Sequence, residues 1–212
     1  MDIVAQAQEE VRKTRERIRV LDEDSLDLLF RKARSYHAFT DRPVPHEKLR
    51  ELHALMNWGP TSTNGNPARI IFLTTDEAKA PLMPALNPGN VAKVAGAPVT
   101  ALIAYDVKWY ENLERLFPHR DMSGPYRSDP EKAASGAFRN SSLQGAYFML
   151  AARAIGLDIG GLSGFDNMIL DDVFFADTNL RSNFLCNLGY GDETALFQRL
   201  PRLEFDEVCE IR

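Results

Sequence analysis

The sequence has few features of an exported or membrane-spanning protein. It contains only two cysteines in 212 residues, and we expect both to be reduced thiols, with Cys186 filling the core and Cys209 outside any nucleophile motif. The longest largely apolar stretch, residues 94–105, is too short to cross a bilayer as a helix and is predicted to form a buried strand. The N-terminus mixes acidic with basic side chains and lacks the apolar centre of a signal peptide. These absences indicate a cytoplasmic protein.

An excess of positive charge and a metal-ligand cluster are also missing. The formal net charge of -5 and the pI near 5.4 argue against broad binding to nucleic acid or to anionic membranes. His46 and His53 could share one helix face, but no third metal ligand accompanies them at a convincing spacing. His119 and Asp121 are too close in sequence to specify a catalytic pair. We therefore expect no metal and a small-molecule partner.

The hydrophobic pattern predicts one mixed α/β domain. With 44% hydrophobic and 26% charged residues, the chain can bury a sizeable core. Residues 1–20 are charge-rich and are expected to be an extension of unknown role, while residues 21–212 form the domain. Periodicity predicts helices over residues 26–32, 46–56, 78–86 and 131–155, and strands over residues 69–74, 98–105 and 183–189. Gly156 is placed to end the long helix in a left-handed conformation.

Two polar segments carry groups suited to a phosphorylated cofactor. Residues 33–44 place Arg34 beside Ser35, and a basic side chain next to a hydroxyl and free backbone N–H groups matches a phosphate. Residues 59–67 offer hydroxyl and amide side chains that can bind sugar hydroxyls and ring edges. Taken alone, the first segment also fits a helix end followed by a turn, and the second fits an ordinary polar loop.

Four more segments follow in the same chain. Residues 89–93 place an asparagine and a lysine before an expected strand, and residues 139–144 add polar groups inside the long helix. Residues 156–166 are rich in glycine, which lets backbone N–H groups approach a ligand closely. Residues 189–203 carry Arg199 and Arg202. A dinucleotide-binding fingerprint in the glycine-rich segment is a weak alternative, because the G-x-G-x-x-G spacing and a preceding strand are missing.

In this order the six segments, spread over about residues 25–205, resemble those of the FMN-dependent nitroreductase family. The resemblance implies an α/β (α+β) fold of three layers, with a central mixed sheet flanked by helices, in an intertwined homodimer. It also implies that one chain holds the FMN phosphate while the proline-hydroxyl-asparagine segment of the partner closes over the cofactor. The cofactor-binding residues implied in this way are Arg34, Ser35, His37, Pro60, Thr61, Ser62, Asn64, Asn90, Lys93, Ser163, Gly164, Arg199 and Arg202.

The resemblance implies catalytic roles for Lys93, Ser163 and Gly164. An ammonium group at Lys93 would stabilise the negative charge that reduced flavin carries around N1 and O2. Ser163 and Gly164 match family positions that pack near flavin N5. A helix lysine in contact with solvent is the ordinary alternative for Lys93 when its segment is considered alone.

Within the family, the chain more closely resembles the malonic semialdehyde reductases of uracil degradation, through residues 58–62, 67–70, 137–142, 163–166 and 199–203. This implies ping-pong hydride transfer from NADH or NADPH through flavin N5 to malonic semialdehyde, giving 3-hydroxypropionate. Ala33 and His37 replace basic residues of the usual phosphate motif, and Ala68 replaces an aromatic residue common in nitroreductases. A broad nitro, quinone or enal reductase and a non-catalytic flavin-binding protein are the alternatives.

Overall fold

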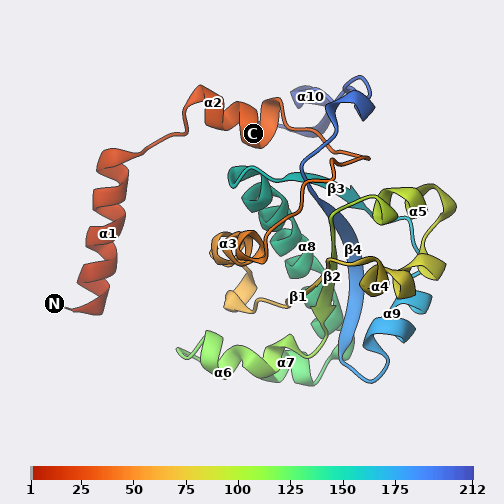
Figure 1. The fold of residues 1–212 in the computed structure, drawn as a ribbon. Helices are drawn as coiled ribbons and strands as arrows, with labels where there is room; N and C mark the ends of the chain where they lie inside the picture. Colours follow the sequence, from red (N-terminus) through yellow and green to blue (C-terminus); the bar gives the residue numbers. More distant parts are fainter. Residues whose placement is uncertain (1) are drawn as a thin grey trace.

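A four-stranded sheet forms the centre of the computed structural model, which describes residues 2–212. The strand order is β1-β2-β4-β3, and each neighbouring pair is antiparallel (Figure 1). The expected mixed sheet is therefore antiparallel in its four strands, and the parallel contribution is a single bridge between Ser35 and Ile159. The strands are β1 (Ala68–Leu73), β2 (Val99–Asp106), β3 (Asp158–Leu162) and β4 (Leu180–Gly189).

Helices cover both faces of the sheet, which confirms the expected three-layer fold (Figure 1). One face packs against α3 (His46–Met56) and α8 (Pro130–Ala154). The other packs against the 3-10 helix η3 (Ala80–Ala85), α5 (Pro88–Ala95) and α9 (Asn167–Phe175). The shorter elements are α2 (Glu23–Leu26), the π-helix η1 (Asp27–Arg31), η2 (Ser62–Asn64), α4 (Asp76–Lys79), η4 (Trp109–Asn112), α6 (Leu113–Leu116), α7 (Gly124–Arg127), η5 (Glu193–Ala195) and α10 (Phe205–Val208).

Strand β2 is largely apolar because it is buried on both faces over residues 99–104. Ala101 and Ile103 belong to the core cluster on the α8 side, whereas Leu102 and Ala104 belong to the cluster on the α9 side. Successive side chains of a strand point to opposite faces, so a continuous apolar run is what a doubly covered strand requires. The prediction of a buried strand at residues 98–105 is confirmed.

Local signals explain the long helix α8. The Asp129 side chain accepts a hydrogen bond from the Lys132 backbone N–H at 3.0 Å, which caps the first turn, and Pro130 occupies a position that needs no donor. Gly156 follows the end of α8, and its φ of +77° lies in the left-handed region that glycine adopts readily. The expected helix over residues 131–155 agrees with this to within a residue at each end.

Two elements were not expected from the sequence. Strand β3 contains Gly160 and Gly161, and the hydrophobic pattern predicts no strand there. A Cβ on Gly160 would collide with the Tyr36 carbonyl, so glycine lets the Ser35–Tyr36 segment lie against this strand. Helix α9 was also missed, although Asp166 caps it by accepting hydrogen bonds from the Met168 and Ile169 backbone N–H groups.

Two expected helices are shorter or less regular than predicted. Residues 26–32 form the end of α2 and a π-helix, and residues 78–86 divide between α4 and a 3-10 helix that contains Pro81 and Pro84. Proline lacks the donor that a continuous α-helix needs, which accounts for the change at residue 80. Strand β4 starts at Leu180, earlier than the predicted residue 183.

The N-terminal helix α1 (Ile3–Arg17) projects away from the rest of the chain and buries none of its residues (Figure 1). Asp2 caps it by accepting a hydrogen bond from the Val4 backbone N–H at 3.3 Å. Across residues 2–212, no helix is both long and apolar enough to span a bilayer.

Candidate functional site

Three of the sequence-predicted site residues meet beside the N-terminal half of α5. The Asn90 side-chain amide donates a hydrogen bond to the Gly164 carbonyl at 2.9 Å, and its oxygen accepts one from the Lys93 ammonium at 3.2 Å. The Asn87 backbone N–H donates to the same Gly164 carbonyl at 3.0 Å. Two segments more than seventy residues apart in sequence are thereby joined, and Lys93 is held by a neutral partner that leaves its charge uncompensated.

Glycine is required at position 164 by close packing. A Cβ there would lie 2.6 Å from the Asn90 side-chain nitrogen and 3.1 Å from that of Asn87. Ser163, the preceding residue, is exposed to solvent beside this contact. The glycine-rich segment therefore forms β3 and a tight loop against α5, and no dinucleotide fingerprint is needed to explain it.

Two buried polar residues of the sheet, which sequence analysis overlooked, hold α5 through hydrogen bonds. The Asn187 side chain donates to the Lys93 carbonyl at 2.9 Å and accepts from the Thr100 hydroxyl at 2.8 Å. Thr100 is fully buried and Asn187 nearly so, so both polar groups are satisfied by each other and by α5. The available signal was an asparagine inside the apolar run of residues 183–189.

Arg34 and Arg199 form a second cluster, at the β3 edge of the sheet. The Arg34 guanidinium donates to the Phe197 carbonyl, and the Arg199 guanidinium donates to the Ala33 carbonyl at 2.8 Å. The exposed His37 ring lies 6.1 Å from the Phe197 ring, between centroids. The expected convergence of the first and last motif segments is thus present in the structure.

Ser35 and Arg202 differ in how they join this cluster. Ser35 is exposed and forms the parallel bridge to Ile159, which fixes its segment against β3. Arg202 donates to the carbonyls of Leu200 and Pro201, at 3.1 and 2.9 Å, so it turns back on its own segment. The structure therefore places Arg34 and Arg199 together and leaves Arg202 outside their contacts.

The segment Pro60–Asn64 lies at the opposite edge of the sheet, where it leads into β1. The Tyr147 hydroxyl donates to the Pro60 carbonyl at 2.9 Å, and the Asn140 side-chain oxygen accepts from the Ser62 backbone N–H at 2.8 Å. Both partners belong to α8, and Asn140 is one of the polar residues expected inside that helix. Thr61 accepts from the Asn66 backbone N–H at 3.2 Å.

Within one chain, this segment does not meet the other candidate residues. Edge strand β1 is separated from edge strand β3 by β2 and β4, and Arg34, Ser35 and Gly164 lie at the β3 side. The two parts of the expected site are thus on different edges of one sheet.

The charge distribution fits a phosphorylated, electron-accepting cofactor such as FMN. Among residues 2–212, none of the ion pairs involves Lys93, Arg34, Arg199 or Arg202. Arg34 and Arg199 donate to backbone carbonyls, so their charges can neutralise a phosphate, and Lys93 could face a ring that becomes negative.

The cysteines take no part in this arrangement. Cys186 is fully buried in the core between the sheet and α8, and burial raises the pKa of its thiol to about 12. A neutral buried thiol packs as a small hydrophobic group, as expected from the sequence. Cys209 is exposed on the C-terminal segment, and both cysteines are free.

The layers and the cationic clusters define an α/β protein suited to an anionic cofactor. The sequence pattern of the nitroreductase family matches residues 30–190. A Stenotrophomonas maltophilia protein described as an NADH dehydrogenase/NAD(P)H nitroreductase is 54% identical over 191 residues, covering 90% of this chain and 97% of that protein. The chain belongs to the nitroreductase family.

Solved structures of the family share the fold. An Exiguobacterium sibiricum nitroreductase in complex with FMN superposes with a TM-score of 0.78 at 19% identity, covering 91% of this chain and 99% of that one. A Staphylococcus epidermidis NAD(P)H:FMN oxidoreductase gives a TM-score of 0.79 at 22% identity, covering 91% and 98%. The expected family, fold and oxidoreductase class are confirmed, and the Exiguobacterium sibiricum structure contains FMN. The malonic semialdehyde reductase branch stays a prediction.

Proposed function

We propose that the protein is a homodimeric FMN-dependent oxidoreductase that takes hydride from NADH or NADPH and delivers it to a carbonyl acceptor. The contact between Lys93, Asn90 and Gly164 carries the proposal, because it joins an uncompensated cation to a loop with close backbone access. When bound, FMN would supply the ping-pong hydride-transfer chemistry through N5.

The chain contributes binding, orientation and fixed charge. Arg34 and Arg199 would hold the phosphate together with Ser35 and His37, and Arg202 would join them if its segment turns toward the anion. Lys93, fixed by Asn90, would supply positive charge at the edge of the ring that becomes more negative on reduction. Ser163 and Gly164 would lie near N5, where small groups leave room for both substrates.

The position of Pro60–Asn64 supports a homodimer. This segment lies at the β1 edge, away from the β3 edge that carries Arg34 and Ser35. In the proposed dimer, Pro60, Thr61, Ser62 and Asn64 of one chain close over the flavin held by the other. Each of the two sites would then need both chains.

Malonic semialdehyde is the acceptor we propose, with 3-hydroxypropionate as product. The resemblance of residues 137–142 and 199–203 to that branch supports it. Reduction of nitro compounds, quinones or enals is the second candidate, and the name of the 54% identical relative favours it. Ala68 argues against a strong preference for nitroaromatic compounds, because an aromatic residue common at this position is missing.

Anaerobic half-reactions test the proposal. The purified yellow protein is first titrated with NADH or NADPH, and bleaching of the flavin absorbance is recorded. The reduced protein is then mixed with a panel of semialdehydes, enals, quinones and nitroaromatic compounds. We expect fast bleaching and fastest reoxidation by malonic semialdehyde. Bound FMN that neither nicotinamide reduces would favour a non-catalytic flavin-binding protein instead.

A further inference from the structure

A groove of about 1200 Å³ runs along β1 and has a positively charged lining. Its walls come from α3, from the segment between Trp58 and β1, and from α6 with the preceding η4. Among the residues of the described chain that line it are three arginines and two histidines, and neither an aspartate nor a glutamate. In a protein of formal net charge -5, this is a local concentration of positive charge that fits an anionic ligand.

The three arginines of the groove differ in how their charge is compensated. Arg69 pairs with the Asp106 carboxylate at 2.9 Å and donates to the carbonyls of Asn66 and Ala68. Within residues 2–212, no ion pair involves Arg50 or Arg115. A carboxylate entering the groove would therefore gain most from Arg50 or Arg115.

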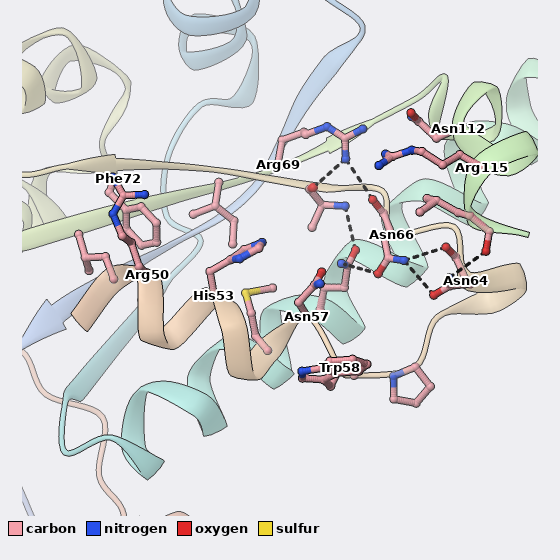
Figure 2. A pocket seen from close by; sticks show the side chains of 18 of the residues that line it. Arg50, His53, Asn57, Trp58, Asn64, Asn66, Arg69, Phe72, Asn112 and Arg115 are labelled. Carbon is pink, nitrogen blue, oxygen red and sulfur yellow. Dashed lines mark hydrogen bonds between the residues drawn. The ribbon is translucent and has the colours of Figure 1, made fainter. Parts of the chain in front are cut away.

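Of Arg50 and Arg115, it is Arg115 that lies at the end of the groove adjoining the proposed flavin contact. The Asn64 side chain donates to the Leu116 carbonyl at 2.9 Å, which ties α6 to the segment Pro60–Asn64. Figure 2 shows Arg115 and Asn112 at this end, near Asn64, with Arg50 on α3 at the other end.

We propose that Arg115, assisted by the amide of Asn112, binds the carboxylate of the acceptor beside the flavin held by the partner chain. A guanidinium group binds a carboxylate through two parallel charge-assisted hydrogen bonds and would orient the acceptor by its acidic end. The substrate class is thus small carbonyl compounds that carry a carboxylate. This inference rests on the proposed function, because it needs the segment Pro60–Asn64 to face a bound flavin.

The test compares wild type with Arg115→Gln and the matched control Arg50→Gln, which removes the same charge from the far end of the same groove. Each FMN-loaded protein is assayed for kcat/KM with malonic semialdehyde and with propanal, which has three carbons and no carboxylate. Each is also titrated with malonate, and binding is followed by the change in flavin absorbance. Equal FMN content establishes that each variant is folded and loaded.

We expect Arg115→Gln to lower the preference for malonic semialdehyde over propanal by about ten- to a hundred-fold and to weaken malonate by a similar factor, as for loss of one charge-assisted contact. Arg50→Gln should change both by less than about two-fold. An unchanged preference and malonate affinity in Arg115→Gln, or equal losses in both variants, would overturn the inference. Malonate binding that depends on Arg115 in a protein that NAD(P)H does not reduce would uphold it and reject the proposed function.

Discussion

Asn90 donates a hydrogen bond to the Gly164 carbonyl at 2.9 Å, and this contact fixes the distance between α5 and the loop that follows β3. The same side chain accepts from Lys93 at 3.2 Å, so the position of the ammonium group depends on the position of the loop. A change at Gly164 should therefore affect the electrostatics at Lys93.

Replacing Gly164 with alanine should disturb the candidate site more than the fold. The new Cβ would lie 2.6 Å from the Asn90 side-chain nitrogen, so Asn90 must move and release Lys93. We expect weaker FMN binding and slower flavin reduction, measured by fluorescence titration and stopped-flow absorbance. Gly89→Ala is the control, because nothing lies within 4 Å of its added Cβ and alanine favours the helix. If Gly164→Ala binds FMN and is reduced as wild type is, the contact between Gly164 and Asn90 does not contribute to function.

Lys93→Met should lower the reduction potential of the bound flavin. Methionine keeps much of the apolar stem and removes the positive charge that favours the reduced form. A loss of about 1.4 kcal/mol in that preference corresponds to roughly 30 mV for a two-electron couple. Spectroelectrochemical titration measures the shift, with Lys108→Met, an exposed lysine after β2, as control. A potential equal to that of wild type with FMN fully bound would remove Lys93 from the mechanism.

Arg34→Ala should weaken FMN by about ten- to a hundred-fold, because one charge-assisted contact to the phosphate is lost. The effect should decline at high salt. Arg202→Ala should also weaken FMN, but less, since Arg202 bonds to its own segment at Leu200 and Pro201. Equilibrium titration of both apoproteins at two salt concentrations provides the comparison. A larger loss for Arg202→Ala would mean that the C-terminal segment rearranges around the phosphate.

The sequence identified chemical groups better than their arrangement. Helix α3 and most of β2 were predicted because their apolar periodicity is regular and reflects burial directly. Strand β3 was missed because the two glycines that admit the Ser35–Tyr36 segment weaken the strand signal. Arg115 was overlooked because its significance comes from a hydrogen bond between Asn64 and α6, a contact that local pattern does not encode.

Lys79 should make the stability of the protein depend on alkaline pH. It is 3% exposed and donates to the Ala97 carbonyl, and burial lowers its pKa. Between that lowered pKa and the ordinary value of 10.5, the unfolded chain binds more protons than the folded one, so stability rises with pH in this window. Urea unfolding at pH 7.5 and 10 should show wild type gaining stability relative to Lys79→Met. A constant difference between the two proteins would contradict this.

In the proposed dimer, each flavin site combines Arg34 of one chain with the segment Pro60–Asn64 of the other. Arg34→Glu would repel the phosphate, and Ser62→Trp, at an exposed position, would block the ring without disturbing the core. Each variant alone should form a dimer that lacks FMN. A mixed dimer has one site with both defects and one with neither if the site is shared between chains.

Differently tagged variants are therefore co-expressed, the mixed dimer is isolated by sequential affinity steps, and its FMN content is measured by absorbance. We expect one FMN per mixed dimer. A mixed dimer without FMN would show that both groups act within one chain and would contradict the shared site.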